Sequence, residues 1–173
     1  MKFLSTLVLA FACSTALAGP ADPSTFDATP YAPQKALYDF NFEKPLDVMP
    51  AFGYVKNHLE ALRKYGDAKA SRIVIVAHGN ELHALSRRNR ALYPQMYDEL
   101  KALAAAGVTI RVCNNAAHAR GYAAEDFYDV VTVAPAAVID IARWQNEGYS
   151  YMYAEWFPRL TRDDLVKQNP QLQ

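Results

Sequence analysis

The chain has 173 residues, of which 51% are hydrophobic, 12% aromatic and 21% charged, and its 18 basic and 18 acidic side chains give a formal net charge of zero. This length predicts one domain with a proper hydrophobic core, and the apolar content excludes disorder over most of the chain. Two cysteines cannot frame a chain of this size with disulfides. Zero net charge gives no long-range attraction to a polyanion, so nucleic acid is not an expected partner.

The first eighteen residues have the pattern of a cleavable signal peptide. Met1 and Lys2 form a short basic start, and residues 3–17 form an apolar run too short to span a bilayer comfortably. Ala16-Leu17-Ala18 supplies the small-x-small pattern that signal peptidase recognises. We therefore expect an exported, periplasmic protein with no membrane anchor after signal removal. A buried N-terminal helix is the alternative, and the residues before Cys13 do not match a lipoprotein pattern.

The remaining chain divides into three parts. Residues 19–34 contain four prolines and are expected to be an extended, flexible leader. Residues 35–155 are expected to form one α/β domain. Residues 156–173 form a C-terminal tail, in which Thr161 and Asp164 predict the capped start of a short helix. Loss of the signal removes Cys13 and one basic residue, which leaves a formal charge of −1 and a single thiol.

The expected elements of the central part alternate between strands and helices. Apolar alternation and a continuous apolar run predict strands at residues 36–42, 72–77, 108–113, 130–133 and 149–153. Apolar residues at helical spacing, with glycine stops, predict helices at 48–65 after a capping Asp47, at 82–85, at 93–106 and at 136–147. Strands separated by helices with short connections require a mainly parallel five-stranded sheet in a three-layer α/β fold with helices on both faces.

Cys113 is the first candidate for chemistry. An unpaired cysteine in an exported protein is buried and inert, is paired between chains, or is used chemically. Alternation along 108–113 places Cys113 opposite the aliphatic set, at the carboxyl end of a parallel strand, where open α/β sheets build their sites. A short helix at 114–120 would stabilise a thiolate, and His118 and Arg120 would add positive charge. A structural, inert Cys113 is the alternative, since free cysteine is among the most buried residue types.

His78 is the second candidate, because it follows strand 72–77 at the same sheet edge. There it is placed to act as a base or hydrogen-bond partner of Cys113, although a histidine at a strand end is more often a structural turn residue. The scattered histidines and one cysteine make no zinc signature, so neither a metal nor another cofactor is expected. The sequence has no Gly-rich phosphate loop and no Gly-x-Ser-x-Gly elbow, which disfavours nucleotide-dependent chemistry and serine hydrolysis.

Two further patterns favour binding surfaces. Arg87, Arg88 and Arg90 form a basic cluster that is usually a solvated face but also suits an anionic oxysulfur species or an acidic patch of a partner. Three tyrosines alternate along residues 149–153, which is typical of subunit packing and also of stacking sites for sugars or bases.

Four groups of motifs, in order, resemble the DsrE-like sulfur-relay family. They are Val76-Ala77-His78-Gly79, residues 101–108 with 110–115 and 119–121, residues 131–136, and residues 145–151. The similarity covers roughly residues 35–153. It implies a small α/β protein that assembles as a trimer or hexamer. In the sulfur-relay members of this family, a cysteine after the third strand carries a persulfide between partner proteins, and the matching residue here is Cys113.

Two functions follow from the residues and the resemblance. The first is an exported sulfur carrier or sulfurtransferase that holds a persulfide on Cys113, with a sulfur donor or acceptor protein as partner. In it His118 and Arg120 stabilise the thiolate and His78 is the base. The second is a non-catalytic homo-oligomer that binds a ligand or a partner, with a structural Cys113. Redox sensing through a sulfenic acid is a third use of the same thiol.

Overall fold

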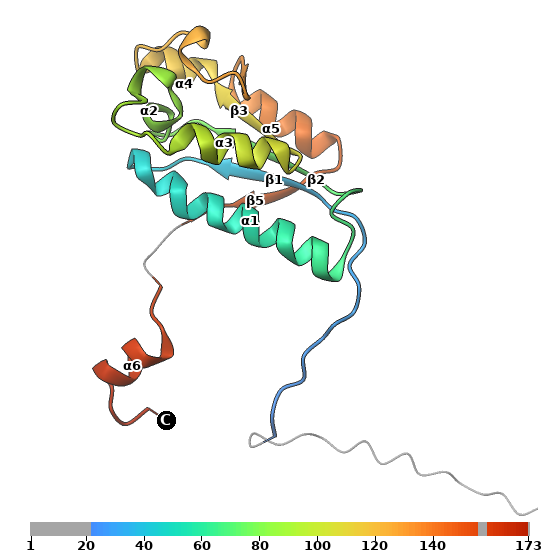
Figure 1. Cartoon of the computed structure of the whole chain (residues 1–173). Coiled ribbons are helices and arrows are strands. Elements are labelled where there is room, and N and C mark those ends of the chain that lie inside the picture. The colour runs from blue at the N-terminus through green and yellow to red at the C-terminus, as the bar shows by residue number, and fades with distance from the viewer. Residues whose placement is uncertain (1–21, 156–158, 173) are drawn as a thin grey trace, which may run out of the picture.

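The structure is a computed structural model that describes residues 22–155 and 159–172. The expected signal peptide, including Cys13, lies outside the described residues, as do Trp156 and Phe157. Residues 23–34 run without helix or strand up to the domain (Figure 1). At their end Tyr31 donates its N–H to the Tyr65 carbonyl at 2.7 Å, which ties this segment to the first long helix.

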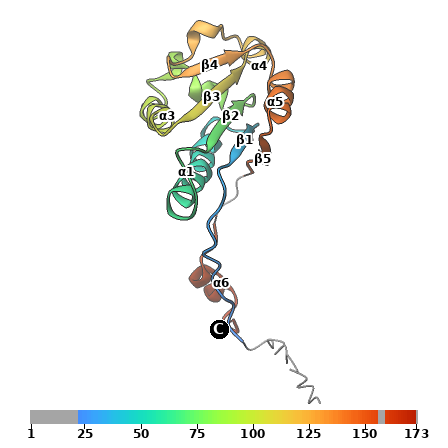
Figure 2. The same cartoon turned by 90° about the vertical axis from the view of Figure 1, so that its right-hand side faces the viewer.

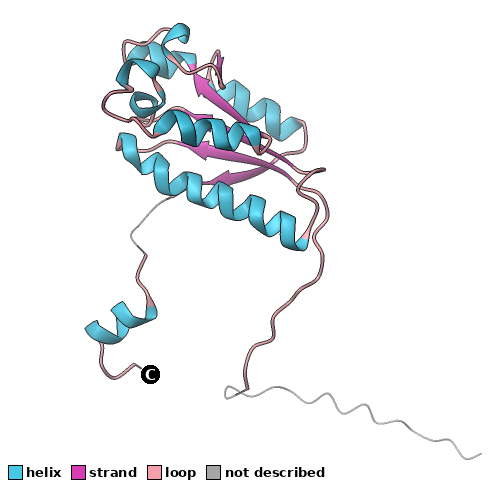
Figure 3. Cartoon of the chain, in the orientation of Figure 1, coloured by secondary structure: helices cyan, strands magenta, loops and turns pink. Residues whose placement is uncertain are grey.

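A five-stranded parallel sheet forms the centre of the domain (Figure 3). Its strands are β1 (Lys35–Phe40), β2 (Arg72–Ala77), β3 (Val108–Cys113), β4 (Val131–Ala134) and β5 (Ser150–Tyr153), in the spatial order β4-β3-β2-β1-β5. Every neighbouring pair is parallel. The predicted α/β fold with a five-stranded parallel sheet is therefore confirmed.

Helices lie between successive strands, as predicted, and one short helix follows the last strand. They are α1 (Val48–Tyr65), α2 (Leu82–Leu85), α3 (Met96–Ala105), α4 (Asn114–Ala119), α5 (Ala137–Asn146) and α6 (Arg162–Gln168), with short 3₁₀ turns η1 (Pro45–Asp47), η2 (Arg87–Asn89) and η3 (Ala124–Asp126). Thr161 and Asp164 cap α6 reciprocally, as predicted: Asp164 donates its N–H to Thr161 Oγ1, and Thr161 donates its N–H to Asp164 Oδ2.

Some local predictions differ from the structure: α3 begins at Met96 rather than at residue 93, and β4 runs from Val131 to Ala134 rather than from 130 to 133. Asp47 makes no side-chain capping bond, because η1 already gives it helical backbone angles and leads directly into α1. β1 ends at Phe40 rather than Phe42. The N–H of Phe42 is donated to the buried carboxylate of Glu81 at 3.0 Å, and this turns the chain away from the sheet.

The connections place most helices on one face of the sheet. α1 and α3 lie on one side, and α5 covers the other (Figure 2). On the α1 side a large core gathers Phe40, Phe52, Ile75, Met96 and Leu100 with their neighbours. A smaller core under α5 contains Leu37, Val74, Val76, Cys113 and Ala137. The chain steps outward from β1 to β4 and then returns across the sheet to β5, so right-handed crossovers put α5, which connects β4 to β5, on the opposite face.

An ion pair under α5 fixes that helix on the sheet. Arg111, in β3, donates from Nε to Asp140 Oδ2 at 2.5 Å, and both side chains are largely buried. The Arg111 guanidinium also lies 5.7 Å from the ring centroid of Trp144, one turn further along α5. Arg111, a polar residue in the alternating pattern of β3, therefore positions the first turn of α5.

Gly79 has the tightest surroundings among the described glycines. A Cβ at Gly79 would lie 2.4 Å from the Phe42 nitrogen and 2.5 Å from Glu81 Oε2. The turn after β2 thus packs directly on the chain that leaves β1, which brings the carboxyl ends of these strands together.

We predict that Gly79→Ala destabilises the fold by about 1–3 kcal/mol, because backbone atoms must shift to accommodate the methyl group. Urea denaturation followed by circular dichroism measures this loss. Gly53→Ala is the matched control, since a Cβ at Gly53 in α1 meets nothing within 4 Å. It should be neutral or stabilise by up to about 1 kcal/mol, as expected for glycine within a helix. Equal stability of the two variants would contradict the close approach at Gly79.

Candidate functional site

A hollow of about 350 Å³ opens at the carboxyl edge of the sheet, between the first turns of α4 and α5. The connection after β3 leads to α4, whose Ala117 is buried in the core on the α1 side, whereas the connection after β4 leads to α5 on the other face. When the connections after two neighbouring strands leave on opposite faces of the sheet, they diverge and create a crevice at the strand ends. The lining residues are His78, Cys113, Asn115, Ala116, Ala136, Ala137 and Val138.

Cys113 lies at the base of this hollow, on the face that the strand alternation predicted. Its side chain is 5% exposed and packs with Val74 and Val76 under α5. The sulfur accepts two backbone N–H groups, from Ala116 at 3.4 Å and from Ala137 at 3.2 Å. One donor belongs to the first turn of α4 and the other to the first turn of α5. Two N–H groups from different helices thus converge on the sulfur.

His78 lines the same hollow, so the structure brings together the two main sequence candidates. Its Nε2 lies 2.7 Å from Asp39 Oδ1 on the neighbouring strand β1. Asp39 also accepts the hydroxyl of Tyr151 from β5, on its other oxygen. Because an ionised carboxylate only accepts, Nε2 carries the proton of this bond, and Nδ1 remains for a second proton. A polar row therefore runs across the sheet edge from Tyr151 through Asp39 to His78.

The hydrogen bonds of this row shift the pKa of His78, Asp39 and Tyr151. The hydrogen bond to Asp39 raises the pKa of His78, against burial, which alone would lower it. Burial alone would raise the pKa of Asp39, but the bonds from His78 and Tyr151 outweigh it and leave that pKa lowered. The bond to Asp39 raises the pKa of Tyr151 to about 12. Asp39 therefore stabilises the imidazolium that forms when the His78 ring takes up a second proton.

Neither His118 nor Arg120 lines the hollow that contains Cys113. His118 is exposed in the last turn of α4 and does not line the hollow. Arg120 donates from Nε to Asn80 Oδ1 at 3.1 Å and from a terminal nitrogen to the Ala116 carbonyl at 3.0 Å. The bond to Asn80 places its guanidinium beside the turn that carries His78, and its charge lowers the pKa of His78.

Glu81 and Asp39 are two buried acids near the hollow, and neither is among the site residues predicted from the sequence. Glu81 is fully buried and accepts N–H groups from Phe42 at 3.0 Å and Gly79 at 2.8 Å. Burial raises the pKa of Glu81, while these two bonds act in the opposite direction. Its charge in turn raises the pKa of His78. Glu81 therefore secures the turn after β2 that carries His78.

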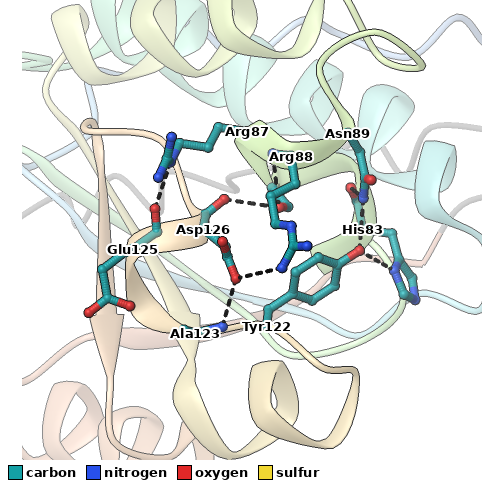
Figure 4. Close-up of polar contacts among 9 residues, drawn as sticks. His83, Arg87, Arg88, Asn89, Tyr122, Ala123, Glu125 and Asp126 are labelled. Carbon is teal, nitrogen blue, oxygen red and sulfur yellow. Dashed lines mark hydrogen bonds and ion pairs between the residues drawn. The ribbon is translucent and has the colours of Figure 1, made fainter.

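Arg87 and Arg88 of the basic cluster contact other residues of the same chain (Figure 4). Arg87 donates to the Glu125 carbonyl at 2.6 Å, and Arg88 lies 3.5 Å from Asp126. Beside them the Tyr122 hydroxyl is 2.8 Å from His83 Nδ1 and from Asn89 Nδ2. This network ties the segment around α2 and η2 to the η3 loop. Arg90 lies 5.8 Å from the ring centroid of Tyr97 and lines a separate hollow of about 380 Å³.

The tyrosines of the last strand occupy an open edge of the sheet. β5 pairs only with β1 among the described strands, and Tyr151, Met152 and Tyr153 are all exposed. Tyr149 instead packs against Trp144 of α5, with ring centroids 5.0 Å apart. Tyr149 lies just before β5, so only Tyr151 and Tyr153 belong to the strand, and the three rings have different environments.

The described residues contain neither a metal-binding cluster nor a membrane-spanning helix. Within residues 22–155 and 159–172, no three His, Cys, Asp or Glu side chains gather in a way that would hold a metal ion. None of the helices in this part of the chain has the length and apolar character to cross a membrane.

Together the fold and site define a small, open parallel α/β protein with one thiol at the strand-edge crevice. Residues 55–154 match the DsrE/DsrF-like family, and this chain belongs to that family. A similar solved structure is that of a protein of unknown function, MTH1491, from Methanobacterium thermoautotrophicum. It shares 22% identity with a TM-score of 0.57, and the match covers 70% of this chain and 99% of that one. This likeness shows the shared fold. No curated protein matches the chain.

We predict that Asp39→Asn lowers the pKa of His78, because the substitution removes the charge and the strongest acceptor of its ring N–H. Folding raises the pKa of His78 above its usual 6.5. The stability from its protonation is therefore fully present below pH 6.5 and is lost as the pH rises through the folded value. The contribution of Asp39 has the opposite sign and is lost as the pH falls below the usual 3.8 of an aspartate.

Titration of the imidazole resonances by NMR measures the shift in wild type and variant. His58 is the internal control, because it bonds to Tyr38 and Gln34 and not to the polar row, and its pKa is lowered by burial. An unchanged His78 in Asp39→Asn would show that Asp39 does not control this ring.

Proposed function

We propose that this member of the DsrE/DsrF-like family is an exported sulfur carrier that holds a sulfane sulfur as a persulfide on Cys113. One observation carries the proposal: the Cys113 sulfur lies at the base of a hollow, accepts two backbone N–H groups, and shares that hollow with His78. A sulfur carrier needs one nucleophilic thiol that a donor can reach, and it needs no metal.

The transfer is an exchange between sulfur atoms. The thiolate of Cys113 attacks the outer sulfur of a donor R–S–SH, a new Sγ–S bond forms, and the S–S bond of the donor breaks with its electron pair on R–S⁻. The products are Cys113–S–SH and R–S⁻, so atoms and charge balance and no external oxidant is needed. Reversal of these steps on an acceptor thiolate passes the sulfur on.

His78 has the role of proton holder in this scheme. Starting from the neutral thiol, the proton of Cys113 moves to Nδ1 of His78 and then to the leaving R–S⁻. Asp39 is a positioning residue, because it binds Nε2 and stabilises the imidazolium that exists between these two proton transfers. His118 and Arg120 contribute positive charge at longer range, through the end of α4.

A second candidate function is a non-catalytic binding protein in which Cys113 is structural. The burial of Cys113 among Val74 and Val76 favours it. Both functions predict that the protein assembles as a homo-oligomer, either a trimer or a hexamer. The exposed side chains of β5 support assembly, because strands of parallel sheets are usually covered on both faces.

We predict that incubation with a sulfane donor adds the mass of one or more sulfur atoms to the purified protein. Intact mass spectrometry detects the adduct, peptide mapping assigns it to Cys113, and a reductant removes it. The Cys113→Ser variant should gain no such mass. Unmodified wild type with an intact circular dichroism spectrum would leave Cys113 as a packing residue and favour the second function.

Export rests on the signal-like pattern of residues 1–18. We predict that the full chain, expressed in a bacterial host with two membranes, accumulates in the periplasmic fraction with Gly19 as its first residue. Mass spectrometry of that fraction measures the cleavage site. Ala18→Leu should retain residues 1–18, since signal peptidase requires a small side chain at this place. Full-length wild type confined to the cytoplasmic fraction would contradict export.

A further inference from the structure

We infer that Tyr151 is a positioning residue of the Cys113 site: it holds the Asp39 carboxylate against His78 and limits the negative charge that this imidazole meets. The inference rests on the proposed function, in which His78 takes the thiol proton. It adds to that step a residue from the open edge strand β5. It follows from the hydrogen bonds of Asp39, the register of β5 and the groups around His78.

The carboxylate of Asp39 divides its two oxygens between two donors. Oδ1 lies 2.7 Å from His78 Nε2, and Oδ2 accepts the hydroxyl of Tyr151. Asp39 is only 9% exposed, so little water can replace either donor. The Tyr151 bond therefore fixes the orientation of the carboxylate and takes up part of its charge on the side away from His78.

The strand register shows that this contact is specific to Tyr151. In the pairing of β1 with β5, Asp39 lies opposite Tyr153, whereas Tyr151 lies opposite Leu37, two residues earlier. The Tyr151 hydroxyl reaches Asp39 diagonally, and Tyr153, which is 64% exposed, forms no hydrogen bond with Asp39 in the described part of the chain. Tyr153 is on the same face of the same strand, so it is a matched control for the loss of one hydroxyl.

Loss of the Tyr151 hydroxyl changes the charge that His78 experiences. In Tyr151→Phe, Asp39 Oδ2 has lost its donor, and the ionised carboxylate depends on its bond to His78. The carboxylate then attracts the imidazolium more strongly, and the pKa of His78 rises. A ring that already carries its second proton cannot take the proton of Cys113. The acidic limb of the pH profile of sulfur loading therefore moves to higher pH.

The other groups around His78 are the same in wild type and variant. Glu81 raises the pKa of His78, Arg120 lowers it, and Cys113 lines the same hollow. The residues of α5 that line the hollow carry no charge. The hydroxyl of Tyr151 bonds to Asp39 and to none of these groups. Its own pKa is raised to about 12, so it remains a donor over the pH range of the test.

The first test is an NMR titration of the imidazole resonances of the mature protein. We expect Tyr151→Phe to raise the pKa of His78 by at least about 0.5 unit, and Tyr153→Phe to leave it unchanged. His58, which bonds to Tyr38 and Gln34, is the internal control in each variant. Circular dichroism verifies that the variants are folded.

A double variant tests whether Tyr151 acts through Asp39. In the Asp39→Asn background, Tyr151→Phe should cause no further shift of the His78 pKa, because the charge that Tyr151 acts on is already removed. An equal shift in both backgrounds would show that Tyr151 acts by another route and would overturn the inference.

The pH dependence of sulfur loading is the second readout. Sodium polysulfide is the probe, and quenched intact mass spectrometry follows the added sulfur on Cys113. The midpoint of the acidic limb should rise in Tyr151→Phe by the same amount as the pKa of His78. It should stay as in wild type in Tyr153→Phe. A change in stability alone does not move this midpoint.

The results separate the role of Tyr151 from the carrier function. An unchanged or lowered pKa of His78 in Tyr151→Phe would overturn the inference, while loading of wild type would still support the carrier function. Absence of loading in folded wild type would overturn the carrier function, and with it the part of Tyr151 in proton transfer. The NMR shift would then still decide whether Tyr151 controls the His78 ring.

Discussion

The reversal of connections between β3 and β4 is the constraint on which the site depends. The chain adds strands in one direction from β1 to β4 and returns to β5 on the opposite face, so the segments leaving β3 and β4 diverge. Cys113 ends one of these strands, and Ala137 begins the helix after the other. The crevice, its depth and the two N–H groups at the sulfur all follow from that divergence. The Arg111–Asp140 pair then fixes α5 at the required height above the sheet.

Most of the fold was predictable because its signals are local. β3 has the predicted bounds at Val108 and Cys113, since an alternating run between a glycine stop and a helix start is marked within ten residues of sequence. The proximity of His78 to Cys113 was predictable as well. Two parallel strands that follow each other in the chain are usually neighbours, and their carboxyl ends then share an edge.

The remaining members of the site could not be predicted, because their contacts depend on long-range pairing. Asp39 reads as an ordinary polar residue of an alternating strand, and Tyr151 as one of several tyrosines. Only the pairing of β1 with both β2 and β5 places Asp39 between His78 and Tyr151. Sequence alternation identifies the face of a side chain but not the strand beside it. In the same way, His118 is close to Cys113 along the chain but lies a full helical turn away in space.

The environment of the Cys113 sulfur has a consequence for how this protein is compared with others. Its two hydrogen-bond donors are main-chain groups of Ala116 and Ala137, and any residue except proline supplies the same N–H. The side chains at positions 116 and 137 can therefore change while the sulfur keeps its two N–H donors. What is inherited is the path of the backbone, and a sequence alignment records that property poorly. Superposition of the β3–α4 and β4–α5 junctions is a better guide to equivalent sites in distant homologues.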